Sequence, residues 1–189
     1  MRILAIDPGT VKAGWGVIEC AGSRIVWVDS GVYRVGRGGI GERLAKIHAQ
    51  IVKLIAEHRP AVVSLERNFV ARNVQSAFRL GEARGAVMAA VAAATPAVEL
   101  CEYTPATIKK AVVGHGRADK EQVQQAVCRL LRMSAEPRED EADALATAAC
   151  HGFRAPFDTR VRAEVERLRA AAPARPAAAK RRAGQRGRR

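Results

Sequence analysis

Two apolar runs that are far apart in the chain each end on an acidic residue. Ile3–Ile6 is followed by Asp7, and Ala61–Leu65 is followed by Glu66. A carboxylate is costly to bury unless it is paired or bound to a cation, so an acid at the end of a buried strand needs an explanation. If the two runs form adjacent parallel strands, both carboxylates lie at the carboxyl edge of one sheet, where α/β folds bind their ligands.

A second pair of acids lies in residues 139–146, which read EDEADALA. Asp140 and Asp143 are three residues apart, and side chains at this spacing share one face of a helix, roughly 5 to 6 Å apart at Cβ. Glu141 stands between them. We expect it to point away from the shared face, and we assign it no role.

Four converging carboxylates repel one another unless a cation neutralises them. Oxygen ligands of this kind suit Mg²⁺ or Mn²⁺ rather than zinc. Two such ions about 3.5 to 4 Å apart can activate a water molecule and stabilise the leaving oxygen of a phosphodiester. Each acid also has a structural explanation: a Pro-Gly turn after Asp7, a solvated strand end at Glu66, and a first helical turn for the other two. Their coincidence in one basic chain favours a shared metal site.

The chain has 189 residues and a formal net charge of +13, which predicts attraction to polyanions, with nucleic acid first and an anionic membrane surface second. We expect no membrane span, because the longest apolar stretch, Gly85–Val98, is shorter than the roughly 20 residues required. We also expect no signal peptide, since Asp7 interrupts the first apolar run. The four cysteines show no C-x-x-C spacing, which favours reduced thiols in a cytoplasmic protein over a zinc site or disulfides.

The apolar periodicity predicts one α/β domain with a five-stranded mixed sheet flanked by helices. Three strands come first, and their short connections require them to be antiparallel to one another. Helices then alternate with two further strands. The predicted strands are Ile3–Ile6, Trp15–Ile18, Arg24–Tyr33, Ala61–Leu65 and Ala97–Leu100, and the predicted helices are Gly41–His58, Asn73–Ala94, Pro105–Val113, Lys120–Leu131 and Asp140–Cys150.

The composition changes beyond Phe157, which predicts a folded domain of residues 1–157 and a basic tail of residues 158–189. The tail begins with a charged helical segment, Arg160–Ala171. Pro173–Arg189 then contains seven basic residues and no acid, so we expect it to be largely disordered. It could tether the phosphate backbone of DNA or simply keep the protein soluble.

Several sequence blocks occur in a recognisable order between about residue 1 and residue 155. They are IDPGT at 6–10 with GWGV at 14–17, ERNFVARN at 66–73 with LGEARG at 80–85, YTP at 103–105, KKAVVGHGRADK at 109–120, and DEADALA at 140–146. In composition and order these blocks resemble the RuvC family of bacterial Holliday junction resolvases. The tail is not covered by the resemblance.

This resemblance implies an RNase H-like fold, a homodimer, and paired Mg²⁺-dependent incisions in opposing strands of a four-way DNA junction during recombination and repair. It implies two Mg²⁺ per subunit, with Mn²⁺ able to substitute, and cooperation with the RuvA and RuvB branch-migration proteins. The four catalytic and metal-binding acids of the family fall on Asp7, Glu66, Asp140 and Asp143. Some members carry histidine at the third position, where Asp140 makes this site fully carboxylate.

Further residues are candidates for DNA contacts, and three of them match positions of the family. Lys109 and Lys120 match basic residues that meet phosphate charge, although Lys110 leaves open which lysine of the adjacent pair faces the site. Phe69 matches an aromatic residue that stacks on a base of the opened junction. Arg72 is expected to contact the DNA backbone. From the sequence alone, Phe69 would also fit a core position, and lysines on helices are usually just solvated.

Two alternatives belong to other classes of protein. The actin-like and sugar-kinase ATPases also carry Asp-x-Gly-Thr after a first strand, but they clamp nucleotide between two lobes, and no second Asp-x-Gly motif follows residue 66. A non-catalytic junction-binding module is disfavoured because all four acid positions are filled.

Overall fold

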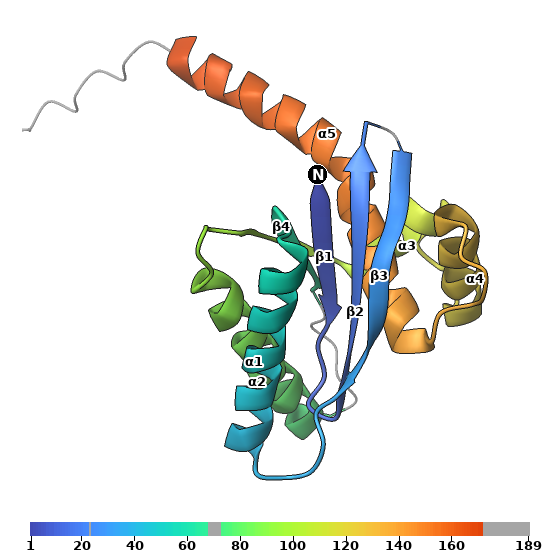
Figure 1. The fold of residues 1–189 in the computed structure, drawn as a ribbon. Coiled ribbons are helices and arrows are strands. Elements are labelled where there is room, and N and C mark those ends of the chain that lie inside the picture. The colour runs from blue at the N-terminus through green and yellow to red at the C-terminus, as the bar shows by residue number, and fades with distance from the viewer. Residues whose placement is uncertain (23, 68–72, 172–189) are drawn as a thin grey trace, which may run out of the picture. The chain divides into compact units, whose positions relative to one another are not determined.

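The computed structural model describes residues 1–22, 24–67 and 73–171, apart from the side chains of residues 156–166 and 168–171. In these ranges the elements are, in chain order, β1 (Arg2–Asp7), β2 (Lys12–Ala21), β3 (Arg24–Arg34), α1 (Ile40–His58), β4 (Val62–Glu66), α2 (Val74–Ala92), β5 (Glu99–Tyr103), α3 (Pro105–Val113), α4 (Lys120–Leu131) and α5 (Glu139–Ala171) (Figure 1).

β1 is the central strand of a five-stranded sheet with the order β3-β2-β1-β4-β5. β2 pairs antiparallel with both β1 and β3, whereas β4 pairs parallel with both β1 and β5. Because parallel neighbours need a crossover connection, α1 precedes β4 and α2 precedes β5. The predicted mixed sheet, with its first three strands antiparallel, is therefore confirmed.

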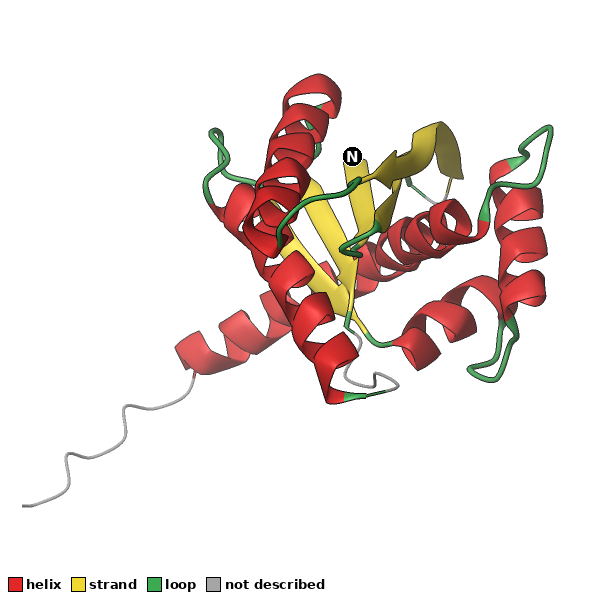
Figure 2. Ribbon diagram, turned by 90° about the horizontal axis from the view of Figure 1, so that it is seen from below, coloured by secondary structure: helices red, strands yellow, loops and turns green. Residues whose placement is uncertain are grey.

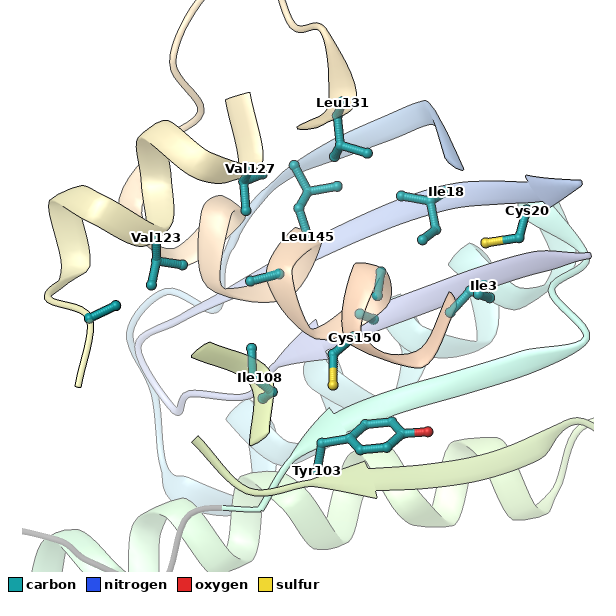
Figure 3. Close-up of a cluster of buried hydrophobic side chains, with 14 residues drawn as sticks. Ile3, Ile18, Cys20, Tyr103, Ile108, Val123, Val127, Leu131, Leu145 and Cys150 are labelled. Carbon is teal, nitrogen blue, oxygen red and sulfur yellow. The ribbon is translucent and has the colours of Figure 1, made fainter. Parts of the chain in front are cut away.

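Helices cover both faces of this sheet (Figure 2). Side chains of β1 alternate between two hydrophobic clusters: Ile3 and Ala5 belong to one, and Leu4 and Ile6 to the other. The first cluster includes residues of α3, α4 and α5, and the second includes residues of α1 and α2. Figure 3 shows the first cluster, in which side chains of α5 such as Leu145 lie among residues of β1, β2 and α4. Burial on both faces explains why β1 is continuously apolar.

The last strand differs from its predicted position. It spans Glu99–Tyr103 rather than Ala97–Leu100, because its pairing with β4 continues until Tyr103 stands beside Glu66. β5 is an edge strand, and two of its five residues are glutamates, Glu99 and Glu102. Its apolar signal is therefore weak and shifted toward the residues that precede it.

The predicted helix Asp140–Cys150 and the predicted helical segment Arg160–Ala171 are parts of one longer helix. One helix, α5, extends over Glu139–Ala171, since the alanine, glutamate and arginine residues of this stretch favour helix. Two compact units are Met1–Pro156 and Phe157–Arg189. The functional division at residue 157 stays a prediction, and residues 172–189 of the basic tail lie outside the described residues. Within the described ranges, none of the helices combines the length and the apolar character needed to cross a membrane.

Candidate active site

Asp7 and Glu66 occupy neighbouring strand ends at the carboxyl edge of the sheet. β1 and β4 are parallel, and Ile6 is the register partner of Leu65, so each strand continues directly into its acid. Both acids line a cavity of about 320 Å³. The other lining residues are Pro105, Ile108, Lys109, Lys120, Val123, Asp143 and Ala146. This is the arrangement expected from two strand-terminal acids.

Asp143 reaches the same cavity from the beginning of α5. This helix lies very close to β2, because a Cβ atom on Gly14 would collide with the backbone carbonyl of Asp140. A Cβ atom on Gly16 would lie 2.6 Å from the side chain of Leu145. Glycine at these two positions therefore lets the first turns of α5 approach the sheet and brings Asp143 to the ends of β1 and β4.

Asp140 does not line this cavity. Its carboxylate forms an ion pair with Lys12 of β2, and the side chains are 20% and 54% exposed, respectively. The two helical acids thus diverge, since Asp143 faces the cavity and Asp140 faces Lys12. The charge of Asp140 still acts on the cavity, because it helps to raise the pKa values of Asp7 and Asp143.

The lysines that line the cavity offset the charge of its carboxylates only in part. Burial is the main cause that raises the pKa of Asp7 to about 8. The charges of Asp143, Glu66 and Asp140 add to this rise, and Lys120 opposes it. The pKa of Asp143 is also raised, mainly by burial. An acid whose ionised form is opposed by burial and by neighbouring carboxylates is one that a bound cation would stabilise.

The donor chemistry fits a hard divalent cation. All four acids offer carboxylate oxygens, which are the ligands that Mg²⁺ and Mn²⁺ prefer. In the part of the chain that the structure describes, no three acidic, histidine or cysteine side chains are grouped closely enough to hold an ion as they stand. To bind a cation together, these side chains would have to converge, and Asp140 would have to leave Lys12.

Lys109 and Lys120 both line the cavity with the acids. Lys120 also forms an ion pair with Glu139 at the beginning of α5. This contact raises the pKa of Lys120 and lowers the pKa of Glu139. Lys110 lines a different cavity. The structure therefore decides which lysine of the adjacent pair faces the acids, and it is Lys109.

Two basic residues near the acids were missed by the sequence analysis. Arg84 of α2 donates hydrogen bonds to the backbone carbonyl of Glu66 and to the carboxylate of Glu102, so it holds the end of β4. Arg84 lies within the LGEARG block, which could have pointed to it. Lys12, in contrast, could not have been found, because no local sequence pattern connects it with Asp140.

Two predicted DNA-contacting residues, Phe69 and Arg72, fall within residues 68–72, outside the described residues. Their roles stay predictions. The segment connects two described features of the site: it follows Glu66 and Arg67, and it precedes the cap of α2, where the side chain of Asn73 accepts a hydrogen bond of 2.8 Å from the backbone N–H of Ser76.

Comparisons with known proteins agree with this geometry. A family model described as the crossover junction endodeoxyribonuclease RuvC matches residues 3–151. The chain belongs to the RuvC family. The RuvC of Alkalilimnicola ehrlichii is 47% identical over 162 residues, which cover 85% of this chain and 96% of the relative. The RuvC of Citrifermentans bemidjiense is 46% identical over 156 residues, which cover 82% and 94% of the two chains.

Solved structures extend the comparison with the RuvC family. RuvC of T. thermophilus in complex with a Holliday junction substrate has a TM-score of 0.78 and 33% sequence identity, and the match covers 84% of this chain and 97% of that one. A yeast mitochondrial Holliday junction resolvase has a TM-score of 0.64 at 11% identity, over 88% and 85% of the two chains, which shows a shared fold alone. The predicted RNase H-like fold and the endodeoxyribonuclease activity on four-way junctions are thereby confirmed, and the ATPase alternative is excluded.

Proposed function

We propose that this RuvC-family chain resolves four-way junctions by hydrolysis that depends on two Mg²⁺ per subunit, for which Mn²⁺ can substitute. Asp7, Glu66 and Asp143 hold the cations, and Asp140 joins them after it leaves Lys12. One observation carries the proposal: carboxylates from β1, β4 and α5 line a single cavity together with two lysines. A positively charged chain with a local acidic cavity is suited to holding metal within a DNA-binding surface.

The bound cations supply an activated water molecule and stabilise charge on the leaving oxygen of the phosphodiester. The chain's own residues do the rest. Asp7 and Glu66 orient the site from the ends of paired strands, and Lys109 and Lys120 face the phosphate and offset its charge. Because the pKa of Asp7 is raised to about 8, its carboxyl group holds a proton near neutral pH and would release it when a cation is bound.

The test is cleavage of a synthetic four-way junction with end-labelled strands by the Asp7→Asn variant in Mg²⁺. We expect the variant to bind the junction without cutting it, because an amide cannot replace an anionic ligand. Glu136 is exposed in the loop before α5, so Glu136→Gln removes a nearby charge and should cut like the wild type. Cutting by Asp7→Asn at the wild-type rate would refute the proposed metal site. The labelled strands also show whether the incisions are paired and symmetric.

Paired incisions need two active sites, which favours a homodimer with α2 as its interface. Val74 and Phe78 of this helix are 72% and 69% exposed. Gly81 and Gly85 continue the same face at helical spacing, and a Cβ atom on either would meet nothing within 4 Å among the residues that the structure describes. Packing among those residues therefore does not explain these glycines. Close approach of a second copy of α2, with the exposed apolar side chains at one end, does explain them.

The remaining assignments rest on family membership and charge. We assign nuclease activity to residues 1–157 and propose that the basic tail of residues 158–189 attracts the DNA backbone without base specificity. Cooperation with the RuvA and RuvB proteins and a cytoplasmic location follow from the same proposed role in recombination and repair.

A further inference from the structure

Glu141, the acid between the two helical metal ligands, is hydrogen-bonded to β3, the edge strand beside β2. Its Oε1 accepts a hydrogen bond of 2.5 Å from the hydroxyl of Ser30 in β3. The same hydroxyl oxygen accepts a hydrogen bond of 2.8 Å from the indole N–H of Trp27. The second carboxylate oxygen of Glu141 accepts a 3.3 Å hydrogen bond from the backbone N–H of Arg138. One side chain thus joins β3, α5 and the loop that leads into α5.

The position of Ser30 makes this contact part of a larger attachment. Ser30 is the register partner of Gly16 in β2. Gly16 is the residue that packs against Leu145, and Gly14 packs against the backbone of Asp140. The beginning of α5 therefore rests on β2 at two glycines, while Glu141 ties it to β3.

Such an attachment controls the rotation of the helix. Successive residues point about 100° apart around an α-helix, so when the direction of Glu141 is fixed, the directions of Asp140 and Asp143 are fixed as well. Close glycine contacts set how deeply the helix lies on the sheet, but they leave rotation and sliding less constrained. A site that binds metal tolerates misplacement of only about 0.5 Å in its ligands. The hydrogen bond to Ser30 supplies the missing constraint.

We infer that Glu141 is a positioning residue that acts through Ser30: it holds the first turn of α5 in the rotation that directs Asp143 into the cavity and keeps Asp140 within reach of it. This inference rests on the proposed metal site and assigns a new role within it. The Glu141 carboxylate binds no cation itself, since both of its oxygens are engaged away from the cavity.

The experiment measures Mn²⁺ binding to the DNA-free protein by electron paramagnetic resonance, beside junction cleavage. We expect Glu141→Ala and Ser30→Ala each to weaken Mn²⁺ binding by roughly tenfold, at the low end of effects reported for residues that orient metal ligands. Cleavage should need correspondingly more Mg²⁺, with the KM for the junction unchanged. Because both residues form one contact, the double variant should be no weaker than either single variant. Glu141→Gln keeps one acceptor oxygen and should recover part of the affinity.

Glu136→Gln is the matched control and should bind Mn²⁺ like the wild type. Mn²⁺ affinity and Mg²⁺ dependence at wild-type values in both Glu141→Ala and Ser30→Ala would overturn the inference, even if thermal stability fell. If Glu141→Ala does not fold, Ser30→Ala decides alone, because it breaks the same contact from the sheet. Asp143→Asn distinguishes failure of the metal site from failure of the role of Glu141. Undiminished Mn²⁺ binding by Asp143→Asn would reject the metal site itself. Loss of Mn²⁺ binding in Asp143→Asn, with normal binding by Glu141→Ala and Ser30→Ala, would reject only the role of Glu141.

Discussion

Lys12 of β2 and Asp140 of α5 form an ion pair beside the cavity that Asp7, Glu66 and Asp143 line. The pair holds one of the four acids away from the cavity. The Lys12 ammonium group neutralises the charge of Asp140, as a bound cation would. Asp140 is the main cause of the raised pKa of Lys12, so the lysine stays charged near neutral pH. At the proposed metal site, Lys12 would therefore compete with a divalent cation for Asp140.

Replacement of Lys12 by methionine should lower the Mg²⁺ concentration that gives half-maximal cleavage. The competing cation is removed while most of the side-chain length is kept. Because Lys12 is well exposed, its pairing is partly screened by water, and we expect a change of no more than about fivefold. A Mg²⁺ titration of junction cleavage measures it. Lys53→Met removes an exposed lysine from α1 and serves as the control; equal Mg²⁺ dependence in both variants would show that Lys12 does not compete.

The raised pKa of Asp7 predicts how the metal-free protein responds to pH. The carboxyl group titrates at about 3.8 in the unfolded chain and at about 8 in the folded one. Between these values the folded state binds more protons, so the free energy of unfolding falls as the pH rises, by up to about 1.4 kcal/mol per pH unit. Asp7→Asn should lack this fall, because its side chain does not titrate.

Urea unfolding in the presence of a chelator, at several pH values from 5 to 8, gives the free-energy difference between the wild type and Asp7→Asn. We expect the wild type to lose stability steadily relative to Asp7→Asn as the pH rises. Added Mg²⁺ should restore much of this lost stability, because it binds the ionised form of the carboxyl group. A difference that does not change with pH would contradict the assigned burial and crowding of Asp7.

Close packing of α5 on β2 predicts that Gly14→Ala is destabilising. The new Cβ atom would collide with the backbone carbonyl of Asp140, and a backbone atom cannot rotate away as a side chain can. Overpacking of this kind costs about 1 to 3 kcal/mol, measurable by urea unfolding, and it should weaken Mn²⁺ binding as well. A Cβ atom on Gly41 would meet no described residue within 4 Å, so Gly41→Ala is the control. Equal stability of the two variants would argue against the close approach of helix and strand.

The exposed face of α2 predicts that Phe78→Asp shifts the protein from dimer to monomer. A charge placed on an apolar interface is costly to bury, whereas Phe78 is already exposed within the single chain. Light scattering at micromolar concentration measures the mass. Gln75→Asp adds the same charge to a neighbouring exposed position and should leave the dimer intact. A wild-type protein that is monomeric under these conditions would rule out the proposed interface.

Removal of residues 172–189 should flatten the salt dependence of DNA binding. The segment carries seven basic residues and no acid, and each phosphate contact contributes about 0.9 to the slope of log affinity against log salt on duplex DNA. Affinity for linear duplex measured across a range of NaCl concentrations gives this slope. A full-length variant with these basic residues changed to glutamine should match the truncation, and an unchanged slope in both would favour a purely solubilising tail.

Much of the fold and part of the site could be predicted, because buried strands and buried helix faces are apolar and can be recognised in the sequence. β1 and β4 are covered on both faces, so their buried residues are apolar except for Ser64 of β4, and Asp7 and Glu66 stand out where the strands end. Parallel pairing then brings the two acids together. The helical pair was less predictable, because a shared helix face does not determine which partners each acid meets.

The parts that could not be predicted depend on contacts between distant segments. Lys12 meets Asp140 only because Gly14 lets α5 approach β2. Ser30 lies opposite Gly16 in a register that shifts between Val17 and Ile18, and a one-residue shift of this kind leaves no clear sequence signal. The helical spacing predicted that Glu141 points away from the metal face, and in the structure it does. Its proposed role depends on the contact with Ser30 of β3, which the spacing does not predict.

Anomalous scattering from Mn²⁺ in crystals of the protein with a bound four-way junction tests the central claim most directly. We expect manganese peaks within about 2.0 to 2.6 Å of carboxylate oxygens of Asp7, Glu66 and Asp143, with Asp140 turned from Lys12 toward the same ions. Saturating Mn²⁺ that gives no peak within this distance of Asp7 would contradict the assignment of the cavity as the active site.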